Sequence, residues 1–240
     1  MMFRDLTINQ LQFETSTSFN LTSCGPTSGK KQMRVKRDDD PTKGDCYTFL
    51  ALDPLDKAII SYRVGKRTGE TTIDFVRDVR ARVLGMPFIT SDAFPTYEPS
   101  IRAVFGPGVH YTQIVKTYVN EPPVNAARRY SPGAIVKVAK ERVFGAMPDF
   151  MASTSHVERV NLSVRMGSRR FTRLTNGYSK RVENHEAAVA LFVAHYNLCR
   201  VHESLKMTPA MALGLTDRPW SVAELIDVAV AMIENAVRPN

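Results

Sequence analysis

The residues with the most distinctive chemistry lie in the segment 153–184, where one acidic side chain precedes a run of basic ones. Glu158 is followed by seven cations, and no second acid occurs before Glu183. On a helix with about 3.6 residues per turn, Glu158, Asn161 and Arg165 project from one face. A carboxylate beside a surface that attracts polyanions favours metal-assisted chemistry on phosphate. The seven cations are Arg159, Arg165, Arg169, Arg170, Arg173, Lys180 and Arg181.

Both features also have a purely structural interpretation. Ser155 and Glu158 have the spacing of a capping box, in which the serine is the N-cap and the glutamate reaches back to a free backbone amide. The basic run fits a solvated helix face, although neighbouring like charges repel one another unless an anion binds. From spacing alone, Glu158 is therefore either a helix cap or a catalytic carboxylate.

The composition excludes several classes of protein. The 240 residues contain 32 Lys and Arg against 24 Asp and Glu, and the net charge of +8 favours nucleic acid or another polyanion as partner. Three scattered cysteines, with no Cys-x-x-Cys pair, exclude a zinc ribbon and a disulfide framework. The sequence shows no apolar run of about 18 residues and no signal pattern, so we expect a soluble, cytoplasmic protein that does not bind membranes.

The elements that position these residues begin after a long irregular stretch. Residues 1–44, which are rich in Ser and Thr between 14 and 29, show neither strand alternation nor a helical period, and we expect loop or disorder there. Residues 46–53 and 58–65 are rich in aromatic and β-branched side chains and predict a hairpin. An apolar face of helical period then predicts a helix over 68–84.

Asp92 ends the next short apolar strand. Carboxylates at the C-terminal end of a strand lie where open α/β sheets bind their ligands, but Asp92 before Pro95 also fits a turn or N-cap aspartate. A helix is predicted over 97–105, and strands over 109–119 and 135–144. The order of these elements predicts an α/β domain.

The C-terminal part is predicted to be helical. Residues 182–198 are apolar nearly all round, which indicates a helix buried against the sheet or at a dimer interface. Thr208 precedes a short helix with proline at its first position, and a capping box at 221–224 opens a last helix. The histidines of this region are predicted to be packing or surface residues; they are His185, His195 and His202.

Five runs of the sequence resemble one family in order and spacing. They are GDCYTFLALDP, IISYRVGKRTGETTIDFV, ITSDAFPTY, STSHVERVNLSVRMGSRRFTRLTNGYSKRVENH and YNLCRVHESLKMTPAMALGL. Together they are similar to the catalytic domain of bacterial insertion-sequence transposases of the DDE class, in the family named after insertion sequence one. The resemblance covers about residues 43–228.

The resemblance implies an RNase H-like fold over residues 45–240, with a mixed sheet flanked by helices and a helical C-terminal part. In such a site three acids hold two Mg²⁺ (or Mn²⁺) ions for cleavage and strand transfer of DNA. Asp92 matches the second acid and Glu158 the third, so both are expected to be catalytic and to bind metal. The expected partners are transposon ends, target DNA and further copies of the chain, in a bacterial or archaeal nucleoid. The residues expected to contact DNA are Arg159, Asn161, Arg165, Arg169, Arg170, Arg173 and Lys180.

The sequence departs from this family near its N-terminus. The first acid belongs in an opening strand with an Asp-Glu-x-Trp motif, which residues 1–44 do not contain. Glu14 is a conceivable substitute, although a glutamate is one methylene longer; Asp45 and Asp53 are poorer candidates. The zinc-binding or helix-turn-helix module that family members usually carry is also expected to be missing. An alternative function is therefore a truncated, inactive transposase that only binds DNA.

A compensated frameshift over residues 16–29 is a second explanation for the missing acid. With permissible third bases, the codons of this stretch read one register over as Asp-Glu-Leu-Gln-Leu-Asp-Glu-Leu-Trp-Ala-Tyr-Val-Gly, which contains the motif. Under this hypothesis, residues 1–44 are a damaged N-terminal segment. The nucleotide sequence of the gene tests this hypothesis. If its codons do not encode Asp-Glu-Leu-Trp in the shifted frame, the hypothesis is excluded.

Overall fold

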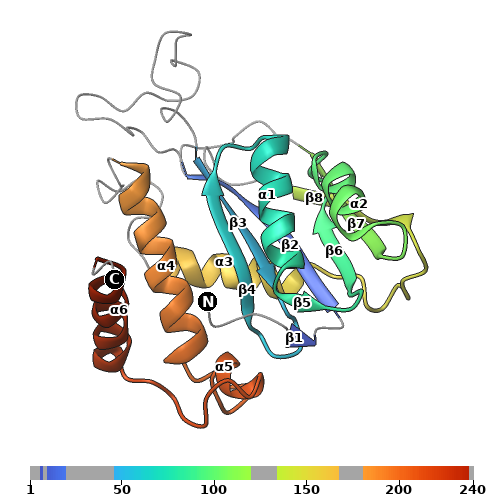
Figure 1. Ribbon diagram of the computed structural model, residues 1–240. Coiled ribbons are helices and arrows are strands. Elements are labelled where there is room, and N and C mark those ends of the chain that lie inside the picture. The colour runs from blue at the N-terminus through green and yellow to red at the C-terminus, as the bar shows by residue number, and fades with distance from the viewer. Residues whose placement is uncertain (1–5, 8–9, 20–45, 120–133, 168–180, 238–240) are drawn as a thin grey trace, which may run out of the picture.

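The computed structural model describes residues 6–7, 10–19, 46–119, 134–167 and 181–237, which form a mixed α/β fold (Figure 1). The strands of its main sheet are β2 (Gln10–Phe19), β3 (Cys46–Leu52), β4 (Ile59–Gly65), β6 (Phe88–Asp92), β7 (His110–Val119) and β8 (Ala134–Phe144). Within the described residues their spatial order is β4-β3-β2-β6-β7-β8. The first three strands in sequence are antiparallel neighbours, β6 and β7 run parallel to β2, and β8 is antiparallel to β7.

The prediction of an irregular segment over 1–44 is wrong for residues 10–19, which form the central strand β2. Residues 10–19 form β2, in which Phe13 lies opposite Ala51 of β3 and Ser91 of β6. A central strand bonds to neighbours on both sides, and this pairing outweighs a weak local pattern of Ser and Thr. Apart from β1 (Leu6–Thr7) and β2, the residues of 1–44 lie outside the described part, including most of the stretch assigned to a frameshift.

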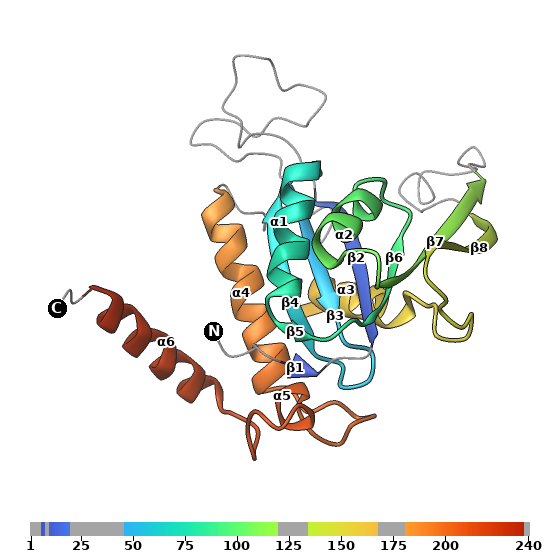
Figure 2. The same cartoon turned by 45° about the vertical axis from the view of Figure 1, so that its right-hand side comes forward.

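The helices of the described residues are α1 (Gly69–Arg80), α2 (Tyr97–Phe105), α3 (Ser155–Gly167), α4 (Val182–Leu198), α5 (Pro209–Ala212) and α6 (Val222–Val237). α1 and α2 cover one face of the sheet, whereas α3 and α4 pack on the other (Figures 1 and 2). Strand alternation in β3 supplies both cores, because Phe49 packs with α1 and α2 while Leu50 packs with α3 and α4. The predicted hairpin of β3 and β4 is confirmed, as are β6, α2, β7 and β8.

One predicted helix boundary is wrong. The helix predicted over 68–84 ends at Arg80, and Val83–Leu84 form β5, a short strand parallel to β1. Val83 continues the apolar period of α1 and is itself buried, so periodicity alone extends the helix too far. Downstream, α3 includes only the first part of the basic segment 153–184, and residues 168–180 lie outside the described residues.

The C-terminal helices begin at the predicted caps. The Thr208 hydroxyl accepts the Met211 backbone N–H at 3.2 Å, and Ser221 and Glu224 exchange capping bonds of 2.8 and 3.2 Å. α4 packs against β4, as its apolar sequence predicted, while α6 extends away from the sheet (Figure 2). Among the described residues, no helix combines the length and apolar character needed to cross a membrane.

Candidate functional site

Asp92 lies at the C-terminal end of β6, on the face of the sheet that α3 covers. Its backbone pairs in register with Ile114 of β7, which is 6% exposed and packs against Met147 and Ala152 in the segment that leads into α3. Thr90, two residues earlier on the same face, donates its hydroxyl to the Met147 sulfur at 3.6 Å. The strand therefore presents Asp92 on the side of the sheet that carries Glu158.

Glu158 occupies the first turn of α3 and is held by two donors. Its Oε1 accepts a hydrogen bond from the Thr154 hydroxyl at 2.5 Å. The same oxygen forms an ion pair with the Lys116 ammonium. Lys116 follows Ile114 by two residues on β7, so the two side chains share a face of the sheet. From strand spacing, the Cα atoms of Lys116 and Asp92 lie about 8 Å apart. Asp92 and Glu158 thus lie at the same end of the same sheet face.

The capping box predicted for Ser155 and Glu158 is wrong. α3 begins one residue earlier than that prediction requires, because the Glu158 N–H donates to the Thr154 carbonyl at 3.0 Å and Ser155 is already helical. The Ser155 N–H donates to the Ser153 hydroxyl at 3.2 Å instead of to Glu158. The Glu158 carboxylate consequently points to Lys116 and Thr154 and lines a cavity of about 380 Å³ between β7, β8 and the segment before α3.

The candidates for a third carboxylate differ in position. In the pairing of β2 with β3, Glu14 lies opposite Leu50. In the pairing of β2 with β6, Phe13 lies opposite Ser91, so the next positions along the two strands are Glu14 and Asp92. The Glu14 side chain and the whole of Asp45 lie outside the described part of the structure. Asp53 follows β3 at the opposite end of the sheet. Its carboxyl accepts the Leu55 N–H at 2.9 Å, and burial raises its pKa to about 6.

The described donors have the chemistry that Mg²⁺ or Mn²⁺ prefers, because Asp92 and Glu158 supply hard carboxylate oxygens. Lys116 is a competing cation at Glu158 and must move aside for a metal ion to bind there. Within the described residues, His, Cys, Asp and Glu side chains form no group of three or more that could hold a metal ion. The described carboxylates alone therefore do not make a complete set of acidic ligands.

The predicted DNA contacts lie in different environments. Arg159 is exposed beside a large cavity, and Arg165 is half-buried near the end of α3. Asn161 is only 6% exposed, which corrects its assignment to a DNA-binding surface. It lies on the side of α3 that packs against the sheet, next to the buried Val157, Val160 and Val164. The remaining predicted contacts lie outside the described residues; they are Arg169, Arg170, Arg173 and Lys180.

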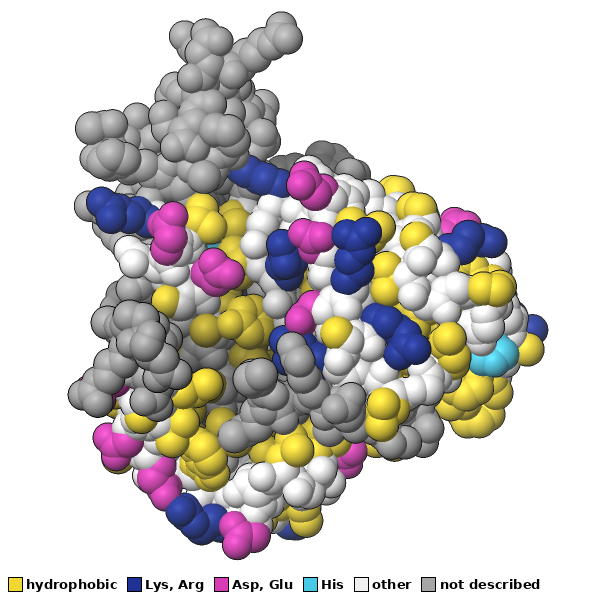
Figure 3. Space-filling model, viewed as in Figure 1, with side chains coloured by type: hydrophobic (Ala, Val, Ile, Leu, Met, Phe, Trp, Pro, Cys, Tyr) yellow, Lys and Arg dark blue, Asp and Glu magenta, His cyan; other side chains and the backbone are white. Residues whose placement is uncertain are grey.

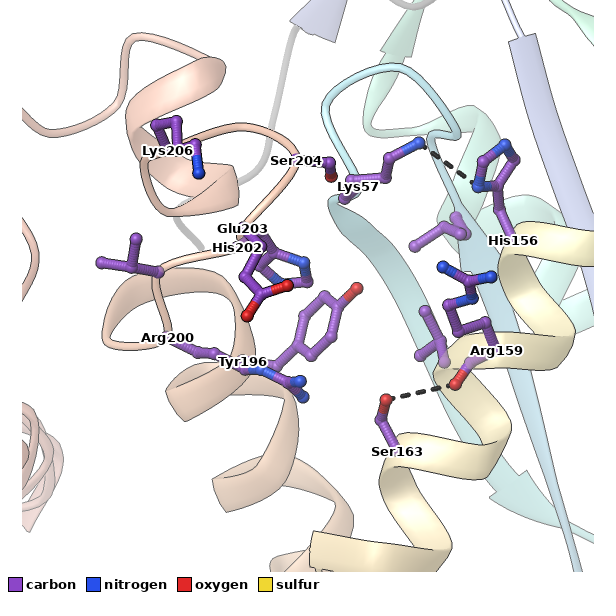
Figure 4. Close-up of a pocket in the computed structure, with 13 residues that line it drawn as sticks. Lys57, His156, Arg159, Ser163, Tyr196, Arg200, His202, Glu203, Ser204 and Lys206 are labelled. Carbon is purple, nitrogen blue, oxygen red and sulfur yellow. Dashed lines mark hydrogen bonds between the residues drawn. The ribbon is translucent and has the colours of Figure 1, made fainter.

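A cavity of about 750 Å³ between α3 and the end of α4 was not predicted from the sequence (Figure 4). Its walls come from the β3–β4 turn, the first turns of α3, the end of α4 and the segment 200–206. We call this cavity the basic pocket. The polar and charged residues that line it are Lys57, His156, Arg159, Ser163, Tyr196, Arg200, His202, Glu203, Ser204 and Lys206.

The ionisable groups of the basic pocket influence one another. Burial lowers the pKa of His156, and the nearby charges of Lys57 and Arg159 lower it further. The pKa of His202 is lowered by burial and by the charges of Arg200 and Lys57. Both shifts favour the neutral form of the imidazole. Arg159 was the one residue of this set to which the sequence assigned a binding role, beside Glu158; most of the others come from separate segments.

Comparisons with known proteins do not identify a family for this chain. No protein-family model matches it, and no curated protein matches it in sequence. One solved structure with some similarity is a piggyBac transposase synaptic complex with hairpin DNA, at 12% sequence identity and a TM-score of 0.35. The similarity covers 92% of this chain, whereas the chain spans only 56% of the length of that protein.

Proposed function

We propose that this chain is the RNase H-like catalytic domain of a DDE transposase of the insertion-sequence-one family. The proposed reaction is metal-dependent cleavage of DNA at transposon ends and transfer of the cut strand to target DNA. The observation that carries the proposal is the placement of Asp92 and Glu158 at one end of one sheet face, although they are far apart in sequence. The resemblance of the sequence assigns these two residues as the second and third acids.

The sheet topology supports the same proposal. β6 lies directly beside the central strand β2 and runs parallel to it, so the C-terminal ends of both strands meet at one edge. Ligands of open α/β sheets bind at such edges. α3 then brings Glu158 to this edge from its first turn, where backbone N–H groups at a helix start favour negative charge. The edge therefore offers carboxylates from a strand and from a helix to one site.

In the proposed site, Asp92 and Glu158 hold Mg²⁺ or Mn²⁺, and a carboxylate from β2 completes the set. The bound ions supply Lewis-acid activation of the attacking and leaving oxygens of a phosphodiester. Thr154 fixes the orientation of the Glu158 carboxylate through its hydroxyl. When Lys116 is displaced from Glu158, its ammonium is free to pair with a phosphate oxygen of the DNA.

The ion pair of Lys116 with Glu158 also favours a second function, a DNA-binding protein without catalysis. Its ammonium neutralises the carboxylate as a metal ion would, and Glu14, a residue one methylene longer than aspartate, replaces the first acid of the family. In this alternative the fold and the basic surfaces are retained while the metal site is incomplete. The two functions predict the same DNA binding but different chemistry on DNA.

The decisive experiment is nicking and strand transfer with Mg²⁺ or Mn²⁺ on duplexes that carry the DNA flanking the gene as candidate transposon ends. Catalysis predicts that Asp92→Asn and Glu158→Gln each lower the rate by at least about 100-fold, because each removes a ligand charge. Glu98→Gln on α2, which removes an exposed carboxylate on the opposite sheet face, is the matched control. Glu14→Gln tests the first acid.

Cleavage that survives both Asp92→Asn and Glu158→Gln would show that the site lies elsewhere. DNA binding without cleavage by the native chain would favour the non-catalytic alternative.

We further propose that the chain acts as a homo-oligomer, since joining two transposon ends requires two sites. Light scattering of the chain with and without end DNA tests this proposal, and a monomer in both samples would contradict it.

A further inference from the structure

The basic pocket collects cations from both of its walls. Lys57 and Arg159 lie on the side of the β3–β4 turn and α3, and Arg200 and Lys206 face them from the end of α4 and the segment after it (Figure 4). Glu203 is the acidic residue among the lining side chains. Within the described residues, no acidic side chain forms an ion pair with any of the four cations. The positive charge of the pocket is therefore available to a ligand.

The backbone conformation of the pocket is unusual at two of these cations. Among the described residues, Lys57 and Lys206 are the non-glycine residues with positive φ, at 55° and 59°. Side chains other than glycine rarely adopt this conformation, and it persists where the surrounding structure enforces it, often at functional sites. The Lys57 ammonium donates to the Pro54 carbonyl at 2.6 Å and to the His156 Nδ1 at 3.2 Å. Both turns thus direct a lysine to the same cavity.

The opposite face of the sheet has a different charge arrangement. There, basic and acidic side chains alternate over α1 and α2 (Figure 3). Basic residues of that face form ion pairs, among them Arg82 with Asp78 at 2.8 Å and Arg102 with Glu98 at 3.3 Å. Like charges that converge without such partners repel one another, and an anion relieves that repulsion. Burial, and then the charges of Lys57, Arg159 and Arg200, lowers the pKa values of His156 and His202, while Asp53 and Asp56 offset part of the charge of Lys57.

The size and lining of the pocket select the kind of anion. A cavity of about 750 Å³ exceeds the space that one phosphate group fills, but it is too small to enclose a DNA duplex. Tyr196 and His202 form an edge-to-face pair at 4.7 Å in its wall, and Arg200 lies 5.9 Å from the Tyr196 ring. A positively charged groove that follows the backbone is typical of proteins that bind single-stranded nucleic acid.

A row of cavities connects the basic pocket to Glu158. The cavity beside Glu158 shares Phe150 and Ser153 with a smaller cavity of about 290 Å³, which in turn shares Lys57 and His156 with the basic pocket. The three cavities therefore follow one another around the first turns of α3. A flexible strand with a phosphate at Glu158 can follow this row, whereas a stiff duplex cannot.

We propose that the basic pocket binds the phosphate groups of an unpaired DNA strand that leads away from Glu158. This inference rests on the proposed function in one respect, namely that the ligand is DNA. The strand places its phosphates on the cations of both walls. The pocket then holds a strand in place without reading its sequence.

The test measures binding of the full chain to a fluorescent 12-nucleotide single strand and to the duplex of the same sequence, in EDTA and over a range of salt concentrations. The double variant Arg159→Ala with Arg200→Ala should weaken single-strand binding by at least about 10-fold at 0.1 M salt. It should also reduce the slope of log K against log salt by about 1.4, because each lost phosphate contact contributes about 0.7. Duplex binding should change much less.

The matched control is Arg77→Ala with Arg102→Ala, which removes the same charge from helices on the opposite sheet face. An equal loss of single-strand affinity in both double variants would contradict binding in the basic pocket. An equal loss of single-strand and duplex affinity, or an unchanged salt dependence of binding, would contradict it as well. The charge-conserving pair Arg159→Lys with Arg200→Lys should keep most of the affinity, and circular dichroism of each variant separates lost binding from lost folding.

Two further readouts separate this proposal from the proposed function. Binding in EDTA does not require catalysis, so the native chain should bind the single strand in EDTA although it cleaves nothing there. If the chain cleaves DNA but the variant without the two pocket arginines binds single strands as tightly as the native chain, only the proposal for the basic pocket is contradicted. A chain that binds single strands through the pocket but cleaves nothing would contradict only the proposed catalysis.

Discussion

The sharpest stability prediction concerns Asp53, the aspartate in the turn between β3 and β4. Its side chain is only 3% exposed, and burial raises its pKa from 3.8 to about 6, although the hydrogen bond from the Leu55 N–H partly offsets this rise. Asp56 next to it raises the pKa further. In the folded protein Asp53 therefore holds its proton to a higher pH than in the unfolded chain.

The sign of the effect follows from proton linkage. Between about pH 4 and pH 6 the folded state binds more protons at Asp53 than the unfolded state, so its contribution to stability falls as the pH rises. A shift from 3.8 to about 6 corresponds to about 3 kcal/mol at neutral pH, at about 1.36 kcal/mol per pKa unit. Asp53→Asn removes the charge and keeps an oxygen for the Leu55 N–H, while its new amide donors cost up to about 1 kcal/mol.

The assay is urea unfolding of the native chain and of Asp53→Asn at several pH values from 3.5 to 7.5. We expect the variant to be about 1 kcal/mol less stable at the acidic end and about 2 kcal/mol more stable at the neutral end. Asp217→Asn, at an exposed aspartate, is the control and should show no such trend. A stability difference that does not change with pH, or that changes in the opposite direction, would refute the reasoning.

Two further substitutions test the packing around the site. Gly145→Ala should destabilise the fold by about 3 kcal/mol in thermal or urea unfolding, because φ is +75° and a Cβ would approach the His110 Cα to 2.8 Å. Gly85→Ala, with the same φ but open space, should cost about 1 kcal/mol, and equal losses would contradict this. Asn197→Ala should lower the free energy of unfolding by about 3 kcal/mol, because the buried side-chain amide donates to the Ile59 carbonyl at 2.9 Å and accepts from the Ile59 N–H at 3.0 Å. A loss below about 1 kcal/mol would show that water replaces the amide at these backbone groups.

The sequence predicted those parts of the fold in which local pattern and tertiary environment agree. The strands at 46–53 and 58–65 alternate or run apolar because they are buried on one or both faces, and their hairpin turn is encoded locally. β2 could not be predicted, since its order comes from hydrogen bonds to β3 and β6, whose paired residues lie 27 or more positions away in sequence. Local propensity carries no information on such partners.

The candidate site was predictable to the same degree. Asp92 and Glu158 lie at an element end and in a first helical turn, positions that spacing and resemblance both indicate. The partner of Glu158 was missed, because Lys116 comes from a strand 42 residues earlier and the capping pattern of Ser155 offered a local explanation. The basic pocket was missed for the same reason: its cations come from segments that only the folded chain brings together.

The first two turns of α3 connect the two proposed sites mechanically. Helical residues are spaced about 100° apart, so Glu158 points into one cavity while His156 and Arg159 line another, within a helix about 10 Å across. Val157 and Val160 lie between them and anchor this face of α3 on the sheet. Any displacement of α3 therefore moves the carboxylate and the phosphate-binding cations together. A DNA strand held in the basic pocket would in this way be kept at a fixed distance from Glu158, and strand positioning would be coupled to the geometry of the proposed metal site.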